Sequence, residues 1–301
     1  MTPMVSGPEA LVSWLLEQRA RDSAVLAAGF GGDSACAPIW VIRRADAGPH
    51  QLPATAGARP VGVLPAPPAP VRLAPDAQAR PRRVQVGGRP AGTMGAVVHD
   101  LEGRPCMLGN AHVLVPAGMA VPAAGEGPRP AISPAQDIAV FEGPPLGRRV
   151  HTASVHRFAP LVPVERGYNL LDGAAARLLR PEASAAPGLG PITGMVTHPR
   201  PGLRVRKLGM GSSRLVRGAV LLRGAAAVLD SHDYGTAGCG ERFVFADQLI
   251  ANVDQAGGDS GALLVDDDGR AVGLTHARLP GGLALAAPAD CVAKSLGVRF
   301  G

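Results

Sequence analysis

Ser260 has the residue types around it that nucleophilic catalysis requires. It lies in the segment AGGDSGALLV, with glycines on both sides of an Asp-Ser pair. A serine hydroxyl is a poor nucleophile unless a histidine takes its proton, a third group orients that histidine, and amide donors receive the developing oxyanion. Histidines and aspartates both precede Ser260 in the chain, so the sequence predicts it as the nucleophile of an acyl transfer.

The tetrapeptide GGDS occurs twice, and only the second copy has this context. Ser34, in the first copy, is followed by Ala35, and no histidine precedes it. An α/β-hydrolase arrangement does not fit Ser260 either, because that fold needs the motif G-x-S-x-G and a catalytic histidine after the serine. Ala262 stands at the second glycine position, and the only later histidine, His276, belongs to the same expected hairpin. We therefore interpret Ser34 as part of a turn.

His112 is the histidine whose surroundings best suit a general base. It lies in MLGNAHVLV, where small residues favour a strand that ends in a tight turn, far upstream of Ser260. The other histidines stand in segments without such a pattern. This long separation suits two successive β-barrels that meet at a shared site.

Two aspartates are candidates for the group that orients His112. Asp137 opens the run DIAVFE, but the Pro/Gly-rich stretch between it and His112 leaves little room for intervening strands. Asp172, in NLLDGAAARL, lies farther along the chain and leaves that room. We favour Asp172 as the acid, with Asp137 as the alternative.

Short apolar runs bounded by glycine and proline fill the chain from about residue 83. They include GTMGAVVHD, PCMLGN, DIAVFE, LRVRKLG, AVLLRG, RFVFADQLI, GALLVDDDG and AVGLTHA. This spacing favours antiparallel β-sandwiches or barrels over βαβ units. Before these runs, Pro8 and Glu9 begin a predicted helix. Residues 48–82 are too rich in proline for a regular helix or the interior of a sheet, so we interpret them as a linker or an extended segment that lies over the main domain. Because aromatic residues are only 3% of the chain, the core must consist mainly of Val, Leu, Ala and Ile.

The ordered motifs resemble chymotrypsin-like serine proteases. Over residues 93–298 they are most similar to a trypsin-like subfamily of bacterial cytosolic proteins and related plant proteases. The resemblance rests on GTMGAVV, NAHVL, HRFAPLVP, NLLDGAAARL, PITG, RVRKLG, FADQLI, AGGDSGALLV and the closing LGV. It implies an all-β fold of two antiparallel six-stranded β-barrels of chymotrypsin type, preceded by a helix-containing extension. The expected parts are an extension over 1–82, a first barrel over 83–185 and a second barrel with a short C-terminal helix over 186–301.

The resemblance also implies a role for each residue. His112 is the general base, Asp172 its orienter and Ser260 the nucleophile of a serine endopeptidase. Gly258 lets the backbone turn so that its own amide and that of Ser260 form the oxyanion hole. Gly173 departs from the subfamily, which usually has a small side chain there, so we expect a looser strand beside Asp172. The alternative function is a catalytically inactive trypsin-fold adaptor or peptide-binding module.

Three further residues are expected at the substrate pocket. The resemblance places Asp254 at its floor, where a carboxylate would favour Arg or Lys before the cleaved bond. Thr275 and His276 lie on the strand that should line the same pocket. His276 is a second departure from the family pattern, so the substrate preference stays open.

Composition excludes several other classes of protein. The net charge is +6, but Lys207 and Lys294 are the only lysines and the arginines are scattered, so we expect no nucleic-acid partner. The N-terminal residues lack the pattern of a secretory signal, and no run approaches the ~18 apolar residues of a membrane span, so we expect a cytoplasmic protein that does not bind membranes. The four cysteines lack metal-ligand spacing, which predicts buried free thiols, no metal and no cofactor. A protein or peptide substrate is expected, and a homo-oligomer or a regulatory partner stays open.

Overall fold

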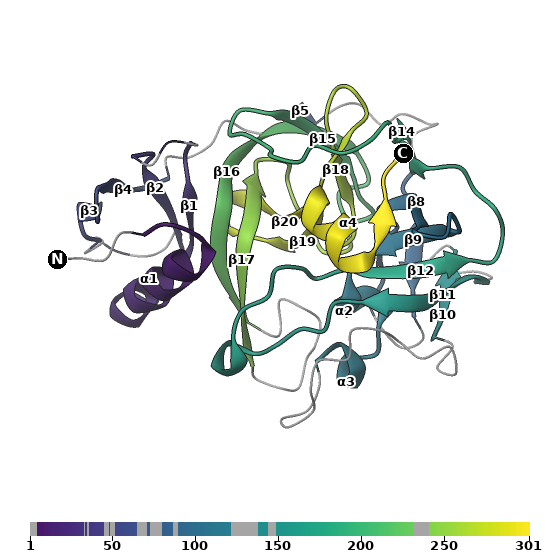
Figure 1. Ribbon diagram of the computed structural model, residues 1–301, viewed down its shortest axis with the longest axis horizontal. Helices are drawn as coiled ribbons and strands as arrows, with labels where there is room; N and C mark the ends of the chain where they lie inside the picture. The colour runs from purple at the N-terminus through teal and green to yellow at the C-terminus, as the bar shows by residue number, and fades with distance from the viewer. Residues whose placement is uncertain are drawn as a thin grey trace.

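The computed structural model describes residues 5–32, 34, 36–44, 48, 52–64, 71–72, 80–86, 90–121, 138–143, 149–230 and 241–301. Strands dominate, and they form two curled sheets with a helix near the N-terminus. Figure 1 shows the purple extension at one end of the molecule, a green and yellow barrel in the middle and a blue and teal barrel at the other end. The expected mainly β fold of two barrels with a helix-containing extension is confirmed.

Six strands of the C-terminal half form a closed barrel. They follow one another in the order β15, β18, β19, β20, β17 and β16, and β15 pairs again with β16 to complete the ring. Their bounds are β15 (Arg204–Leu208), β16 (Leu215–Asp230), β17 (Arg242–Ala251), β18 (Leu263–Val265), β19 (Ala271–Arg278) and β20 (Ala284–Pro288). All of these pairings are antiparallel, as expected for the second barrel.

The other sheet lies mainly in residues 83–191. Its main path runs β8, β9, β12, β11, β10, β6 and β7. Because only Met94 and Gly95 separate β7 from β8, the path begins and ends on one stretch of chain and closes into the first of the two expected barrels. The bounds are β6 (Arg83–Gln85), β7 (Gly92–Thr93), β8 (Ala96–Asp100), β9 (Pro105–Gly109), β10 (Ile138–Glu142), β11 (Val150–Phe158) and β12 (Ala174–Leu178). This path already has seven strands, and the short strands β13 (Ala185–Ala186), β14 (Gly190–Pro191) and β21 (Val298–Arg299) bring the sheet to ten, where six were expected.

The N-terminal extension continues the sheet of the second barrel. Strand β1 pairs with β16, for example Ala27 with Ala227, and β2 then pairs with both β1 and β4. The extension contains α1 (Pro8–Arg21), β1 (Val25–Phe30), β2 (Ile39–Arg43), β3 (Thr55–Ala56), β4 (Arg59–Val63) and β5 (Val71–Arg72). Most of the remaining proline-rich stretch between residues 48 and 82 lies outside the described residues.

Both the charges at its ends and the apolar residues on one side stabilise helix α1. Pro8 occupies the first turn beside the acidic Glu9, and Arg19 and Arg21 lie in the last turn, where each charge complements the helix dipole. Its apolar side packs with β1, β2 and β17 in a single buried cluster. Leu15, on that side, is 0% exposed. The extension therefore shares a core with the second barrel.

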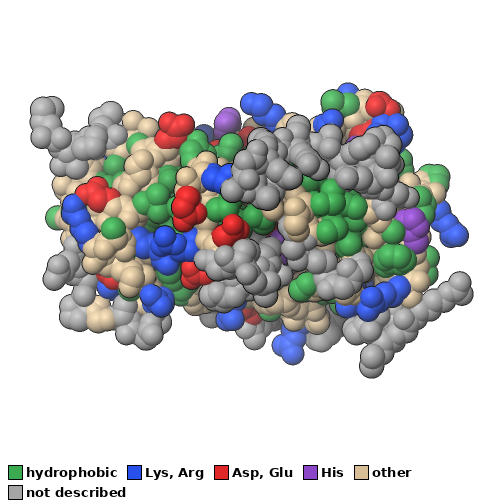
Figure 2. Space-filling view, turned by 90° about the horizontal axis from the view of Figure 1, so that it is seen from below, with side chains coloured by type: hydrophobic (Ala, Val, Ile, Leu, Met, Phe, Trp, Pro, Cys, Tyr) green, Lys and Arg blue, Asp and Glu red, His purple; other side chains and the backbone are tan. Residues whose placement is uncertain are grey.

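Small aliphatic residues build the core, as the low aromatic content requires. Cys106 is buried as expected, but Cys36 is exposed because it lies in a turn before β2, so the expectation of buried thiols was wrong at that position. None of the helices in the described part of the chain combines the length and hydrophobicity that spanning a bilayer requires. On the face in Figure 2, basic and acidic side chains are interspersed among the residues drawn in colour.

We predict that α1 is integral to the barrel's stability. Leu15→Ala should lower the free energy of unfolding by about 2–5 kcal/mol, because it leaves a cavity under the helix. Urea unfolding followed by circular dichroism measures this, with Ser13→Ala on the exposed side of α1 as the control. If the extension of the Leu15→Ala variant unfolded in a separate transition at lower urea, and the urea midpoint of the barrel stayed unchanged, the shared core would be contradicted.

Candidate active site

His112 lies on a single helical turn that follows β9. This turn is α2 (Ala111–Leu114), and His112 is 8% exposed. Its ring Nδ1 is hydrogen-bonded to Oδ2 of Asp172, and its backbone amide donates to Oδ1 of the same carboxylate at 3.2 Å. Asn110 fixes the neighbouring backbone, because its Nδ2 donates to the carbonyl of Asp172 at 2.6 Å. The carboxylate therefore sets both the position of α2 and the orientation of the imidazole.

Asp172 lies two residues before β12 and is fully buried, with an exposed fraction of 0%. Burial alone would raise the pKa of its carboxyl group, but the charge and the hydrogen bonds of His112 outweigh this effect and lower the pKa below its usual value. The carboxylate is therefore ionised at neutral pH. The strand beside it is held in place, because Gly173 accepts a hydrogen bond from the Ala159 amide at 2.9 Å.

Ser260 lies on a loop between β17 and β18 that packs against β7. Its carbonyl accepts a hydrogen bond from the Thr93 amide at 2.8 Å, and its Oγ donates to the carbonyl of His276 at 3.5 Å. Gly261 has φ +93°, and a Cβ there would lie 2.2 Å from the carbonyl oxygen of Thr93. Only glycine permits this close approach of the two barrels. Close packing therefore explains why the second GGDS copy is followed by a glycine.

The amides of Gly258 and Ser260 are available to a ligand. Neither N–H donates a hydrogen bond to any residue that the structure describes. Gly258 has φ +92°, and its carbonyl is held by the hydroxyl of Thr93 at 2.8 Å. Met210 in turn donates its amide to that hydroxyl at 2.9 Å. The peptide groups of this loop are therefore held in place from the first barrel, as a preorganised oxyanion site requires.

A buried ion pair holds Asp259, the residue before Ser260. Lys207 and Asp259 are both 0% exposed, and Lys207 Nζ lies 2.7 Å from Asp259 Oδ2. The ammonium group also donates to the carbonyl of Asp254 and to Oε1 of Gln255, both at 2.8 Å. Burial lowers the pKa of Lys207, and the Asp259 charge partly offsets this effect. All three ammonium protons have acceptors, which is the condition under which a buried ion pair is tolerated.

The second carboxylate oxygen of Asp259 holds the segment that follows β15. Oδ1 accepts hydrogen bonds from the Ser212 amide at 2.8 Å and from the Ser212 hydroxyl at 3.2 Å. A Cβ at Gly209 would lie 2.1 Å from the same oxygen. The segment that follows β15 is therefore shaped around this carboxylate.

The three expected pocket residues lie in different surroundings. Asp254 is partly exposed, has φ +35°, and its carboxylate lies beside Gly282, where an added Cβ would be 3.0 Å from Oδ1. Thr275 is fully buried and donates to the carbonyl of Ala262 at 3.0 Å. His276 is 1% exposed, and its ring is directed at Gln248, with Nε2 2.8 Å from the amide oxygen. Asp137, the alternative acid, lies outside the described residues.

Sequence reasoning assigned no role to four residues that hold this site: Thr93, Asn110, Lys207 and Gln248. Lys207 carried a usable signal, because it is one of only two lysines and stands in the expected strand segment RVRKLG, two residues before Gly209. Asn110 stands two residues before His112, where a polar side chain interrupts an otherwise apolar segment. Thr93 and Gln248 carried no local signal, since their partners are distant in the chain.

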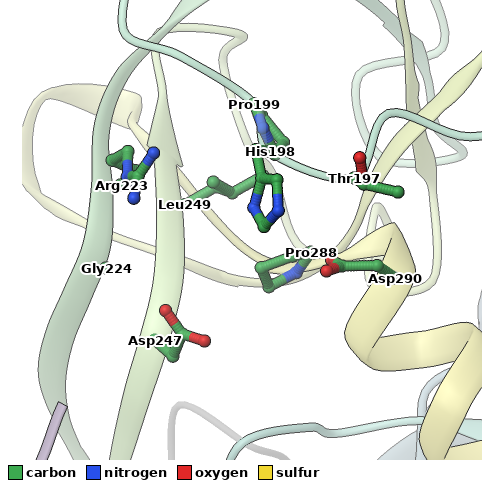
Figure 3. Close-up of a pocket in the computed structure, with 9 residues that line it drawn as sticks. All are labelled: Thr197, His198, Pro199, Arg223, Gly224, Asp247, Leu249, Pro288 and Asp290. Atoms are coloured by element: carbon green, nitrogen blue, oxygen red, sulfur yellow. The ribbon is translucent and has the colours of Figure 1, made fainter. Parts of the chain in front are cut away.

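Two other clusters were tested as sites. Asp100, Cys106 and His156 have ligand atoms within 4.8 Å of one another. However, Arg104 and Arg177 both pair with Asp100, and burial raises the pKa of the Cys106 thiol to about 11, so this group does not fit a metal ion. A separate pocket of about 240 Å³ lies against β16, β17 and the start of α4 (Ala289–Leu296), and Figure 3 shows Asp247, Asp290, His198 and Arg223 around it. It contains none of the proposed catalytic residues.

Comparison with solved structures finds serine proteases. A Nocardiopsis protease is 14% identical, with a TM-score of 0.46 over 74% of this chain and 98% of that chain. A glutamic acid specific serine protease is 13% identical, with a TM-score of 0.48 over 73% and 97%. The chymotrypsin of Cellulomonas bogoriensis is 14% identical, with a TM-score of 0.45 over 74% and 97%. No family model matches the sequence, and the search of curated proteins found no match. The subfamily expected from the motifs therefore stays a prediction.

The buried ion pair gives a stability prediction. Lys207→Met leaves the Asp259 carboxylate buried without a counter-charge and should lower the free energy of unfolding by about 3–5 kcal/mol. Urea unfolding monitored by fluorescence tests this. The control is Lys294→Met, which removes the other lysine of the chain from an exposed position on α4. Equal stability of the two variants would contradict the role of the pair.

The burial of His276 gives a pH prediction. Burial lowers the pKa of His276 to about 4, whereas the unfolded chain binds the same proton near the usual value of 6.5. Stability should therefore fall as the pH decreases from about 6.5 to about 4, by about 3 kcal/mol in total. His276→Gln removes this contribution, so the difference in unfolding free energy between wild type and variant should change with pH by that amount. Parallel pH profiles of the two proteins would show that His276 does not titrate in this way.

Proposed function

We propose that the chain is a serine endopeptidase that hydrolyses peptide bonds through His112, Asp172 and Ser260. The observation that carries the proposal is the pairing of the buried Asp172 carboxylate with Nδ1 of His112. The Ser260 loop supports it, because the amides of Gly258 and Ser260 donate to no residue that the structure describes. Hydrogen bonding at Nδ1 leaves Nε2 as the proton acceptor, which is the tautomer that a general base needs.

The reaction follows from these roles. Nε2 of His112 takes the proton from Ser260 as Oγ attacks the peptide carbonyl, and the amides of Gly258 and Ser260 bind the oxyanion. The imidazolium then donates its proton to the leaving amine, and the C–N bond breaks to give an acyl-enzyme. Water attacks the ester with His112 again as base, and the serine hydroxyl is restored. No cofactor takes part in these steps.

The hydroxyl of Ser260 donates to the carbonyl of His276 at 3.5 Å, whereas the proposed reaction needs its proton directed at His112. We therefore propose that the hydroxyl rotates toward His112 before attack. Catalytic hydrogen bonds are often long or misaligned in free enzymes and tighten when substrate binds. We propose that an occupied site favours the rotated hydroxyl.

We further propose that Asp254 selects a basic side chain before the cleaved bond and that the enzyme acts in the cytoplasm. Asp254 stands six residues before Ser260 in the chain, and its carboxylate lies near Gly282. A carboxylate at the floor of a pocket attracts a guanidinium or ammonium group. Peptides with Arg or Lys at this position should therefore be cleaved faster than peptides with Glu.

The alternative is a catalytically inactive trypsin-fold adaptor that binds peptides without cleaving them. The hydrogen bond between Ser260 and His276 is the observation that favours it, because the hydroxyl is turned toward β19. An adaptor would bind the same peptides with equal affinity after Ser260→Ala and would release no product. The two functions therefore differ in turnover.

Peptide hydrolysis measured by mass spectrometry on a peptide library tests the enzyme. Ser260→Ala and His112→Ala should each abolish cleavage while the fold is retained, and Asp172→Asn should lower kcat by ~10⁴-fold because it reverses the tautomer of the histidine. The control is Asp266→Asn, in the hairpin turn after β18. If Asp137→Asn removes activity and Asp172→Asn does not, the choice of acid is wrong.

A further inference from the structure

A second histidine, His276, lies buried beside the proposed catalytic residues, and the mechanism above leaves its ring unused. The ring packs against Phe245, with centroids 4.6 Å apart and planes inclined by 40°. Its backbone carbonyl accepts the hydrogen bond of Ser260. Asp172 and His112 are the titratable groups that act on it electrostatically. Any charge on this ring would therefore act directly on His112, which gains a proton in the proposed reaction, and on the carboxylate that orients it.

Gln248 decides which nitrogen of His276 carries the proton. Its Nε2 lies 2.9 Å from the carbonyl of Leu170 and 2.7 Å from the carbonyl of Ala246. Both partners are acceptors, so this atom must be the amide NH₂ group. The amide oxygen, which can only accept, faces His276 Nε2 at 2.8 Å. His276 is therefore the tautomer with hydrogen on Nε2 and a lone pair on Nδ1.

The same surroundings keep His276 neutral. Burial lowers its pKa to about 4, the charge of Asp172 opposes this effect, and His112 adds to it. During acyl transfer His112 becomes an imidazolium, and a second cation beside it would raise the energy of that state. A neutral ring at position 276 imposes no such cost. An amide at position 248 suits this requirement, whereas a carboxylate there would favour a charged ring.

Gln248 also connects the acid to the other barrel. Its NH₂ group, on β17, holds the carbonyl of Leu170, two residues before Asp172. Asn169 strengthens this connection, because its amide donates to the carbonyl of Val244 at 2.7 Å. The loop that carries the acid is therefore fixed by strands of the barrel that carries the nucleophile.

We propose that Gln248 and His276 are positioning residues that hold Asp172 in register with His112 and Ser260 without adding charge to the site. Both residues lie in the second barrel, Gln248 on β17 and His276 on β19. Gln248 binds the loop of Asp172 in the first barrel, and the carbonyl of His276 accepts the hydrogen bond of Ser260. The catalytic consequence rests on the proposed function, whereas the tautomer and the geometry of the His112–Asp172 hydrogen bond do not.

Nuclear magnetic resonance of protein labelled with nitrogen-15 histidine tests the proposal without any substrate. In wild type, His276 should carry hydrogen on Nε2 only and remain neutral from about pH 8 to pH 6. The Nδ1 proton of His112 should give a downfield signal, because it is hydrogen-bonded to a buried carboxylate. A His276 that is protonated on Nδ1, or charged at pH 7, overturns the proposal even if no variant folds.

Two substitutions then separate positioning from packing. His276→Phe keeps a ring against Phe245 but removes the donor to Gln248, so the downfield His112 signal should shift or broaden. His276→Gln retains an N–H near the original Nε2 and should restore the signal. His151→Gln, on the exposed start of β11, is the matched control and should leave the signal unchanged. Identical His112 signals in all three variants would overturn the proposal.

Peptide hydrolysis gives the second readout. His276→Phe should lower kcat by about 10- to 100-fold, the effect of a small misplacement of catalytic groups, with KM within about twofold. His276→Gln should recover most of that loss. A rise in KM at constant kcat would place His276 in substrate binding and overturn the proposal. If wild type shows the expected tautomer and His112 signal but hydrolyses no peptide, the positioning role stands and the proposed function fails.

Discussion

The carboxylate of Asp259, buried directly before Ser260, must be neutralised, and the geometry of the Ser260 loop depends on how this is done. Lys207 supplies the counter-charge from β15 and also binds the backbone carbonyl of Asp254 and the side chain of Gln255, which precede Asp259 in the same loop. A buried pair of this kind adds little net stability over a hydrophobic substitute, but it is costly to break. It therefore specifies one conformation of the loop more than it strengthens the fold. The amides proposed to bind the oxyanion belong to that conformation.

Hydrogen bonds between the two barrels hold both the Ser260 loop and the Asp172 loop. Thr93 of the first barrel fixes the loop of Ser260, while Gln248 and Val244 of the second barrel fix the loop of Asp172. Closure of both barrels is therefore needed before the acid, base and nucleophile can lie together. The extension contributes indirectly, because β1 pairs with β16, the strand beside β17.

The sequence predicted structure best where a short segment contained both a strand-like apolar run and residues with a special backbone or chemical role. The apolar runs predicted the barrel strands β8, β15, β17 and β19. Gly261, directly after Ser260, indicated a loop, and the structure shows a backbone conformation there that requires glycine. Strands β1 and β20 were not predicted, because their sequences VLAAGF and ALAAP are rich in alanine, which has low β-propensity. They form because neighbouring strands bury them.

The candidate site was predictable in its residues and less so in their surroundings. The spacing of His112, Asp172 and Ser260 follows from the order of the motifs, and the structure places His112 against Asp172. The expectation for His276 came from its place on a strand, but the direction of its ring depends on Gln248, a residue from another strand. No local pattern encodes a contact between two buried side chains that meet only after both barrels have closed.

The central claim is that Ser260 is an activated nucleophile, and its most direct test is covalent labelling with a fluorophosphonate probe. Peptide mapping by mass spectrometry should locate one adduct on Ser260 in wild type and none in Ser260→Ala or His112→Ala, because labelling requires both the hydroxyl and its base. Folded wild type that remains unlabelled, or an adduct on another residue, would contradict the account.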